Sequence, residues 1–106
     1  MLTRLPNGYH IAIFILRESS AQRVESQLKE RNPQLKVTIC AEEDMSPRVR
    51  AAAEHADMAV VVTRCITHAI TYGIQGLLQH EPVYPASSGS SSILAAIEQR
   101  VRDFSV

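Results

Sequence analysis

Continuous apolar runs alternate with amphipathic segments along the chain. Each run is rich in branched aliphatic residues and poor in charges, which is typical of a strand covered on both faces of a sheet. The three longest runs are residues 10–16, 35–41 and 57–63. A shorter run at residues 82–86 predicts a fourth strand.

Between these runs, apolar residues recur at helical spacing. Ser19 or Ser20 is predicted to cap the first helix and Ser46 the second, because a serine hydroxyl accepts a hydrogen bond from the free N–H groups of a first turn. Pro47 then suits the first helical position of the second helix. The four predicted helices cover residues 19–33, 46–56, 67–79 and 90–104.

The alternation of buried strands and helices predicts an α/β domain with a parallel sheet. We expect four strands in the order 2-1-3-4 with helices on both faces, which is the three-layer arrangement of Rossmann-like and flavodoxin-like domains. No linker or repeat interrupts the pattern, so we assign residues 1–106 to a single domain. Ligands of such domains bind at the edge where the carboxyl ends of the strands meet.

The composition makes several classes of function less attractive. The chain of 106 residues carries 11 basic and 11 acidic side chains, and its formal net charge is zero. This balance does not favour binding to nucleic acid or to an acidic membrane surface. The first ten residues lack the apolar core of a signal peptide, and no apolar run is long enough to span a bilayer. We therefore expect a cytoplasmic protein, and two cysteines fit a reducing compartment.

The patterns of several enzyme classes are incomplete in this chain. The turn RESSAQ after the first strand has no glycine to approach a dinucleotide. Thr63 and Arg64 stand where a response regulator would carry its phosphoacceptor aspartate. Serine, histidine and aspartate all occur, but without the strained elbow that presents a nucleophilic serine. The sequence thus favours a non-enzymatic binding protein over an enzyme.

One predicted helix lacks charged side chains. Between Arg64 and Glu81 the chain contains no Asp, Glu, Lys or Arg, whereas the outer face of a helix in a small domain normally carries them. The helix between Thr67 and Gln79 places its Ile and Leu residues on the sheet and Tyr72 on the outside. An uncharged outer face of this kind resembles a contact surface.

Two glycines lie in the same predicted helix. Gly73 and Gly76 each lower helix stability by about 0.5–1 kcal/mol relative to alanine, and close packing of another surface would offset this cost. We therefore expect a homodimer in which the helix between Thr67 and Gln79 packs across a twofold axis. The alternative is a neutral face that meets solvent.

A serine-rich turn precedes the last predicted helix. Its sequence SSGSSS covers residues 87–92. Hydroxyls, free N–H groups and the positive end of the helix dipole suit a phosphate or a carboxylate. We predict that Ser88, Gly89, Ser91 and Ser92 form an anion cradle, and the alternative is a capped loop without a ligand.

Two motifs in the second half of the chain are similar to those of a known family. VVVTRCITHA contains Thr67 and His68, and PVYPASSGSSSIL contains a turn of the form Ser-Gly-x-Ser-Ser. Together they resemble the bacterial family called domain of unknown function 2325. The resemblance implies a Rossmann-like fold and gives His68 and the serine turn as site positions. Glycines that many members carry after the first strand are replaced here by LRESSAQ, and an aspartate often found before the histidine is replaced near Arg64.

His68 is predicted to begin the uncharged helix at the ligand edge of the sheet, three residues after Cys65. These two residues have no second pair at a suitable spacing, so they do not suit a structural zinc site. A single imidazole beside a dimer interface suits haem, which needs an axial histidine, apolar or small-residue walls and donors for its propionates. We expect His68 to coordinate haem iron or a transition metal. The alternative is a histidine that only forms hydrogen bonds at the start of a helix.

Two functions therefore remain open. The first is a non-enzymatic cofactor-binding or sensing homodimer with haem or a metal at His68. The second is a binding module for a phosphorylated or carboxylated metabolite, held by the serine turn. The residues predicted to contact the cofactor or ligand are His68, Tyr72, Cys65, Gly76, Ser88, Gly89, Ser91 and Ser92.

Overall fold

Three parallel strands form the centre of the structure. The computed structural model describes residues 2–104, in which the strands are β1 (His10–Phe14), β2 (Lys36–Cys40) and β3 (Met58–Val61). Their order is β2-β1-β3, so β1 pairs with both neighbours and Ile13 lies beside Ile39 on one side and Val60 on the other. All five residues of β1 are buried, as expected for a central strand covered on both faces.

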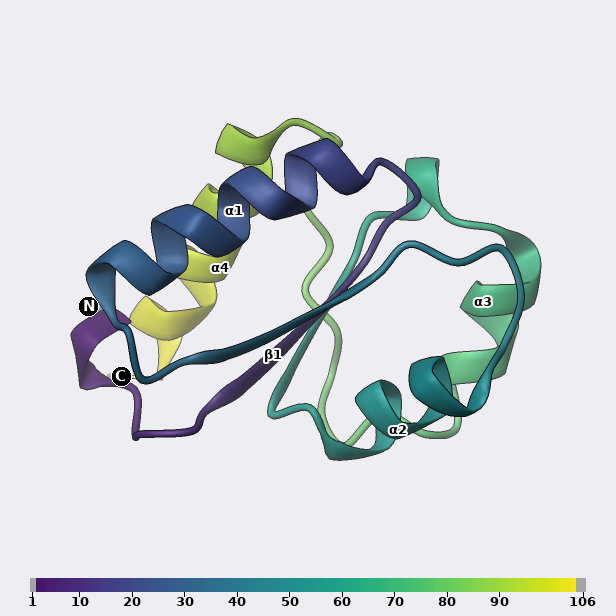
Figure 1. Cartoon of the computed structure of the whole chain (residues 1–106), viewed down its shortest axis with the longest axis horizontal. Helices are drawn as coiled ribbons and strands as arrows, with labels where there is room; N and C mark the ends of the chain where they lie inside the picture. The colour runs from purple at the N-terminus through teal and green to yellow at the C-terminus, as the bar shows by residue number, and fades with distance from the viewer. Residues whose placement is uncertain (1, 105–106) are drawn as a thin grey trace.

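Four helices cover the two faces of this sheet. Helices α1 (Glu18–Arg31) and α4 (Ser90–Asp103) pack on one face, and α2 (Pro47–His55) and α3 (His68–Ile74) pack on the other (Figure 1). Successive residues of β1 alternate between the two resulting cores, because side chains of a strand point to opposite faces in turn. The protein thus has helix, sheet and helix layers.

The predicted fourth strand, and with it the four-stranded sheet of order 2-1-3-4, is wrong. Within residues 82–86, Val83 alone pairs with β3, through an isolated bridge to Val60. The Val83 N–H donates to the carbonyl oxygen of Ala59 at 2.7 Å, and the Val83 carbonyl accepts from the Val61 N–H at 2.9 Å. Residue 85 would be the next to face β3, but Pro85 has no N–H to donate. The described sheet therefore has three strands.

The helix boundaries confirm some of the predicted caps and contradict others. Ser46 caps α2, with its hydroxyl accepting from the Val49 N–H at 3.2 Å, and Pro47 follows as the first helical residue. Helix α1 instead begins at Glu18, so Ser19 and Ser20 lie inside its first turn, and its capping position has no side-chain hydrogen bond. The predicted serine cap of the first helix is therefore wrong, and Arg17 occupies the capping position.

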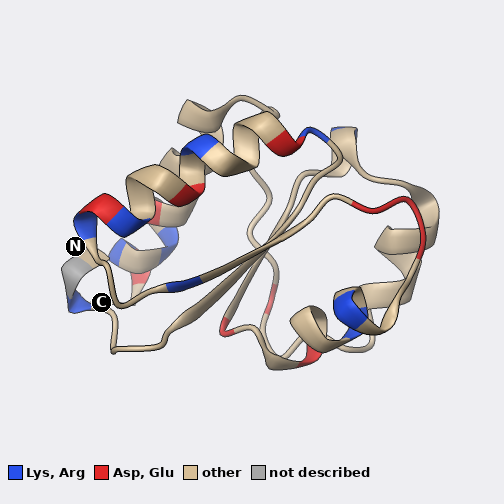
Figure 2. Cartoon of the chain, viewed as in Figure 1, with Lys and Arg blue, Asp and Glu red and all other residues tan. Residues whose placement is uncertain are grey.

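Helix α3 is shorter than the predicted helix between Thr67 and Gln79. It ends at Ile74, and residues 75–77 form a turn closed by a hydrogen bond from the Leu77 N–H to the Ile74 carbonyl at 2.9 Å. Two glycines within four residues weaken helix propagation here. Charged residues lie on α1, α2 and α4, whereas α3 carries none (Figure 2).

Candidate functional site

His68 is the first residue of α3 and is exposed to solvent. Thr67 precedes it as the capping residue, and its hydroxyl oxygen accepts a hydrogen bond from the Ile70 N–H at 3.2 Å. The His68 ring stacks on Tyr72, one turn further along, with ring centroids 6.1 Å apart and an interplanar angle of 22°. The structure therefore brings these two predicted residues together on the outer face of α3.

Cys65 does not join this pair. It lies at the end of the 3-10 helix η2 (Thr63–Cys65) and packs against the core beneath α1 and α4. The helix that carries His68 belongs to the opposite layer. Among residues 2–104, no group of three or more His, Cys, Asp or Glu side chains is placed to hold a metal ion. A metal at His68 would thus need further ligands from its cofactor or from a second chain.

The two glycines of the α3 region have different surroundings. A Cβ atom at Gly73 would come within 2.4 Å of the Met45 side chain, so the loop before α2 is the surface that approaches this glycine. A Cβ atom at Gly76 would meet nothing within 4 Å. Packing of Met45 within the same chain therefore accounts for the glycine at position 73. Gly76 lies at the surface of the turn, with space for a side chain.

The serine turn leads into α4 on the other side of the sheet. Gly89 occupies the capping position of α4, where no side chain makes a capping hydrogen bond. The Ser92 hydroxyl accepts instead from the Ser87 N–H at 3.0 Å, which closes the turn on itself. Ser88 is half-buried and Ser91 is exposed. The free first-turn N–H groups of α4 remain the feature that an anion could use.

The serine turn and His68 belong to different layers of the fold. Helix α4 packs with α1 on one face of the sheet, and α3 packs with α2 on the other (Figure 1). The two predicted parts of the haem site, the axial histidine and the propionate donors, thus come from opposite sides of the sheet.

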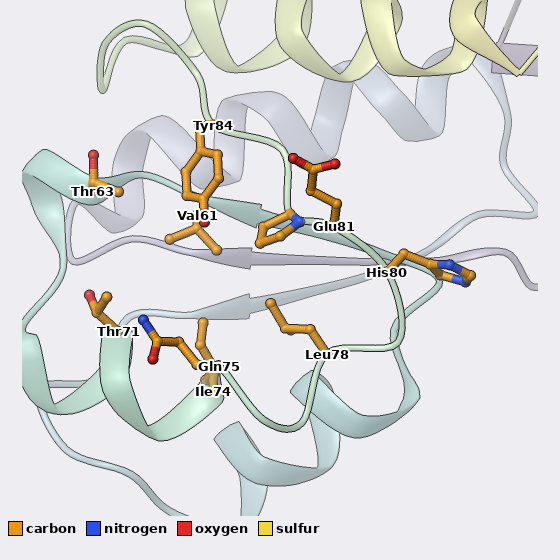
Figure 3. Close-up of a pocket in the computed structure, with 10 residues that line it drawn as sticks. Val61, Thr63, Thr71, Ile74, Gln75, Leu78, His80, Glu81 and Tyr84 are labelled. Carbon is orange, nitrogen blue, oxygen red and sulfur yellow. The ribbon is translucent and has the colours of Figure 1, made fainter.

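A pocket that the sequence pattern did not predict lies at the outer edge of β3. It has a volume of about 340 Å³. Val61 of β3, Ile74 of α3, Leu78 and Tyr84 supply apolar walls, and Gln75, directly after α3, reaches in beside them (Figure 3). We call this cavity the β3 pocket. Pro82 and Pro85, which interrupt the fourth strand, were the signal in the sequence that this edge would stay open.

Few polar groups face the β3 pocket. Thr71 extends from α3 and Gln75 from the turn after it, and Thr63 lies at the far end of the cavity (Figure 3). The side chains of His80 and Glu81 also border the cavity, but both point away from Gln75 and Leu78 (Figure 3). The pocket interior therefore combines hydroxyl and amide groups with apolar walls and has no charge.

The chain matches one protein family over most of its length. The model of a family described as DpdD-like matches residues 2–96. The chain belongs to the DpdD-like family. Comparisons with curated proteins and with solved structures gave no match. The matching family is not the domain of unknown function 2325, which the two motifs resemble.

Both cysteines of this DpdD-like domain are free thiols. Burial raises the pKa of the Cys40 thiol to about 11, with nearby Arg48 lowering it less. A thiol with such a pKa stays protonated at neutral pH and is a poor nucleophile. Cys40 accordingly packs as an apolar residue in the core beneath α2 and α3.

Among residues 2–104, no helix combines the length and the apolar character that crossing a membrane requires.

Proposed function

We propose that this member of the DpdD-like family is a small non-enzymatic module that binds an uncharged ligand in the β3 pocket. The observation that carries the proposal is the cavity itself, which has apolar walls and a few polar groups turned inward. This combination is typical of small-molecule sites, in which apolar area supplies affinity and a few hydrogen-bonding groups fix orientation.

The interrupted fourth strand adds a backbone group to this site. Val61 borders the pocket. In a continued strand its carbonyl oxygen would accept from residue 85, which is a proline without an N–H. A ligand donor can take that place, in the way that an added strand pairs with a sheet edge. A neutral amide next to an apolar or aromatic group therefore matches the pocket, with Gln75 and Thr71 as further partners.

A fragment screen by NMR tests this proposal. Neutral amide and aromatic fragments are expected to shift backbone resonances of residues 61–63, 71–78 and 82–84. Tyr84→Ala should weaken their binding about five- to tenfold, because it removes one wall of the cavity. Tyr72→Ala is the matched control, since Tyr72 is 69% exposed and does not line the pocket. Fragments that bind equally well to both variants would contradict the proposal.

The face of α3 next to the pocket is the proposed contact with a second copy of the chain. Support comes from the uncharged surface between Arg64 and Glu81 and from Tyr72 and Tyr84, which are 69% and 59% exposed. Large exposed aromatic side chains are enriched in protein interfaces. A homodimer formed through this face would bury both tyrosines.

A second candidate function is the binding of a phosphorylated or carboxylated metabolite at the serine turn. The observation that favours it is the start of α4, a helix of 14 residues whose first-turn N–H groups have no side-chain cap. Residues Ser88 to Ser92 would then hold the anion. In the same NMR experiment, phosphate should shift residues 88–92 and leave the β3 pocket unchanged.

A further inference from the structure

A second cavity lies at the opposite edge of the sheet, between β2 and α2. It has a volume of about 350 Å³. Lys36 and Thr38 of β2 line one side, and Arg48 and His55 of α2 line the other, with His10 of β1 beside them. We call this cavity the β2 pocket. No acidic side chain lines it among the described residues, and basic residues occur in both β2 and α2 (Figure 2).

Two alanines of α2 keep this cavity open. Ala51 and Ala52 line it on the helix side. Their side chains end at Cβ, so α2 and the edge strand leave between them a space that a longer side chain would fill. The basic side chains therefore surround a cavity, whereas most charged surface residues extend freely into solvent.

Arg48 is held in place at the end of this cavity. One of its terminal nitrogens donates to the Ile39 carbonyl at 2.8 Å, and the other donates to the Glu42 carboxylate at 3.2 Å. The Ile39 bond fixes the guanidinium against the outer edge of β2. Glu42 offsets part of its charge, but Arg48 keeps further N–H donors, because a guanidinium carries five. Lys36 has no such partner within the cavity lining.

His10 forms a buried polar contact with the same cavity. It is 7% exposed, and its Nε2 lies 2.8 Å from the Thr38 hydroxyl oxygen. The neutral ring carries one N–H, so Nε2 either donates to the Thr38 oxygen or accepts from its hydroxyl, whereas in the protonated ring both nitrogens donate.

The charges around His10 determine how readily it is protonated. Burial lowers its pKa and Lys36 lowers it further, whereas the His55 backbone and the Asp57 carboxylate raise it. Asp57 does not line the cavity, and its carboxylate accepts a hydrogen bond from the His10 backbone N–H at 2.9 Å. An anion in the cavity would add a negative charge on the side that Lys36 now makes positive.

We propose that the β2 pocket binds a small oxyanion, a phosphate or a carboxylate group, between Lys36 and Arg48, and that binding is coupled to protonation of His10. When the anion enters, His10 takes up one proton from solvent, and the Nε2–H of the protonated ring donates a hydrogen bond to the Thr38 oxygen. The Thr38 hydroxyl is then released to donate to the anion. Charge-assisted hydrogen bonds from Lys36 and Arg48 complete the site. This site is independent of the β3 pocket.

An NMR titration of the full chain tests the proposal. Inorganic phosphate and succinate are added in separate experiments, each at about 20 mM and with sodium chloride holding the ionic strength constant. Resonances of residues 36–38 and 48–55 should shift, and the pKa of His10, followed through its ring protons, should rise. A response to phosphate alone assigns a phosphate site, and a response to succinate alone assigns a carboxylate site.

Charge-removal variants separate a site from general attraction of anions. Lys36→Gln and Arg48→Gln should each weaken binding about fivefold or more, because each removes a charged donor. Lys29→Gln on α1 and Arg50→Gln on α2 are the controls, since neither residue lines the cavity. Equal affinities in Lys36→Gln and Lys29→Gln overturn the proposal, and so does a His10 pKa that neither anion changes. Because Lys36 and Lys29 are both exposed, both variants should fold.

Discussion

The pockets at the two edges of the sheet are nearly equal in volume, about 340 and 350 Å³, but differ in chemistry. The β3 pocket has apolar walls with hydroxyl and amide groups between them, and the Glu81 carboxylate at its rim points away from Gln75 and Leu78. The β2 pocket is lined by lysine, arginine and histidine. The two edges of one sheet thus differ in chemistry, because both the strand and the helix that border the β2 pocket carry basic residues, whereas β3 and α3 contribute none to the β3 pocket.

The two edges also differ in how the sheet ends. At β3, a single bridge to Val83 replaces a strand, and the prolines on either side leave the edge partly open. At β2, the Arg48 side chain occupies the Ile39 carbonyl at the edge. Backbone groups of an uncovered edge invite pairing with other chains. Proline restricts further strand pairing at the β3 edge, whereas at the β2 edge the Arg48 side chain takes up a backbone acceptor.

The largest expected effect comes from removing a shared wall of the neutral pocket. Ile74 is 2% exposed and contributes both to the β3 pocket and to the core beneath α2 and α3. Ile74→Ala should lower the free energy of unfolding by about 2–5 kcal/mol, because it leaves a cavity in that core. Urea denaturation measures this loss. Gln75→Ala, at the exposed neighbour, should change stability by less than about 0.5 kcal/mol.

The next prediction concerns self-association through the uncharged α3 face. Gly76→Glu places a charge on this surface, and its Cβ meets nothing within 4 Å in the monomer. The chain should therefore fold normally, while its dimer dissociates at least about tenfold more readily, equivalent to about 1.4 kcal/mol. Sedimentation of this variant, with Gly76→Ala as control, measures the change. A wild-type chain that stays monomeric at high micromolar concentration would remove the basis of this interface.

A smaller effect is expected from His10 at the basic edge. Its pKa is lowered by burial and by Lys36, so between that pKa and the unfolded value of about 6.5 the unfolded chain binds more protons. Stability should therefore fall as pH decreases through this window, with a slope below about 1.4 kcal/mol per pH unit. Urea denaturation at several pH values measures the slope. His10→Gln should reduce it, whereas the exposed His55→Gln should retain it.

The smallest expected effect on stability is that of His68→Ala, below about 0.5 kcal/mol, because His68 is exposed. If His68 is the axial ligand predicted from the sequence, the same variant abolishes the Soret shift on haem titration. His80→Ala should retain the shift. Cys65→Ser controls for thiolate ligation. A wild-type chain that binds neither haem nor divalent metals at micromolar concentrations would contradict a cofactor site at His68. The β3 pocket would then be the preferred ligand site.

Local patterns in the sequence predicted part of the candidate site. His68 at the start of a helix and Tyr72 one turn later are close in sequence, so helical geometry alone places them side by side. The serine turn likewise precedes α4 as predicted. Whether both belong to one site depends on which faces of the sheet α3 and α4 cover, and no local pattern specifies this. The two helices cover opposite faces, so the two parts lie apart. The β3 pocket was missed because its walls come from residues up to 23 positions apart, Val61 to Tyr84.

The amino-acid sequence by itself determined the positions of the three strands, the cap of α2 at Ser46 and the uncharged character of α3, since each follows from neighbouring residues. Burial on both faces holds for β1 and β3, whereas β2 at the edge is buried only at Cys40. Tertiary structure decided the rest. The bridge at Val83 does not extend into a strand, because the next group to pair with β3 would be the N–H that Pro85 lacks. A glycine suits position 73, because the Met45 side chain leaves no room there for a Cβ atom. Long-range packing and hydrogen bonding fix such features, because they join groups whose separation along the chain carries no information about their separation in space.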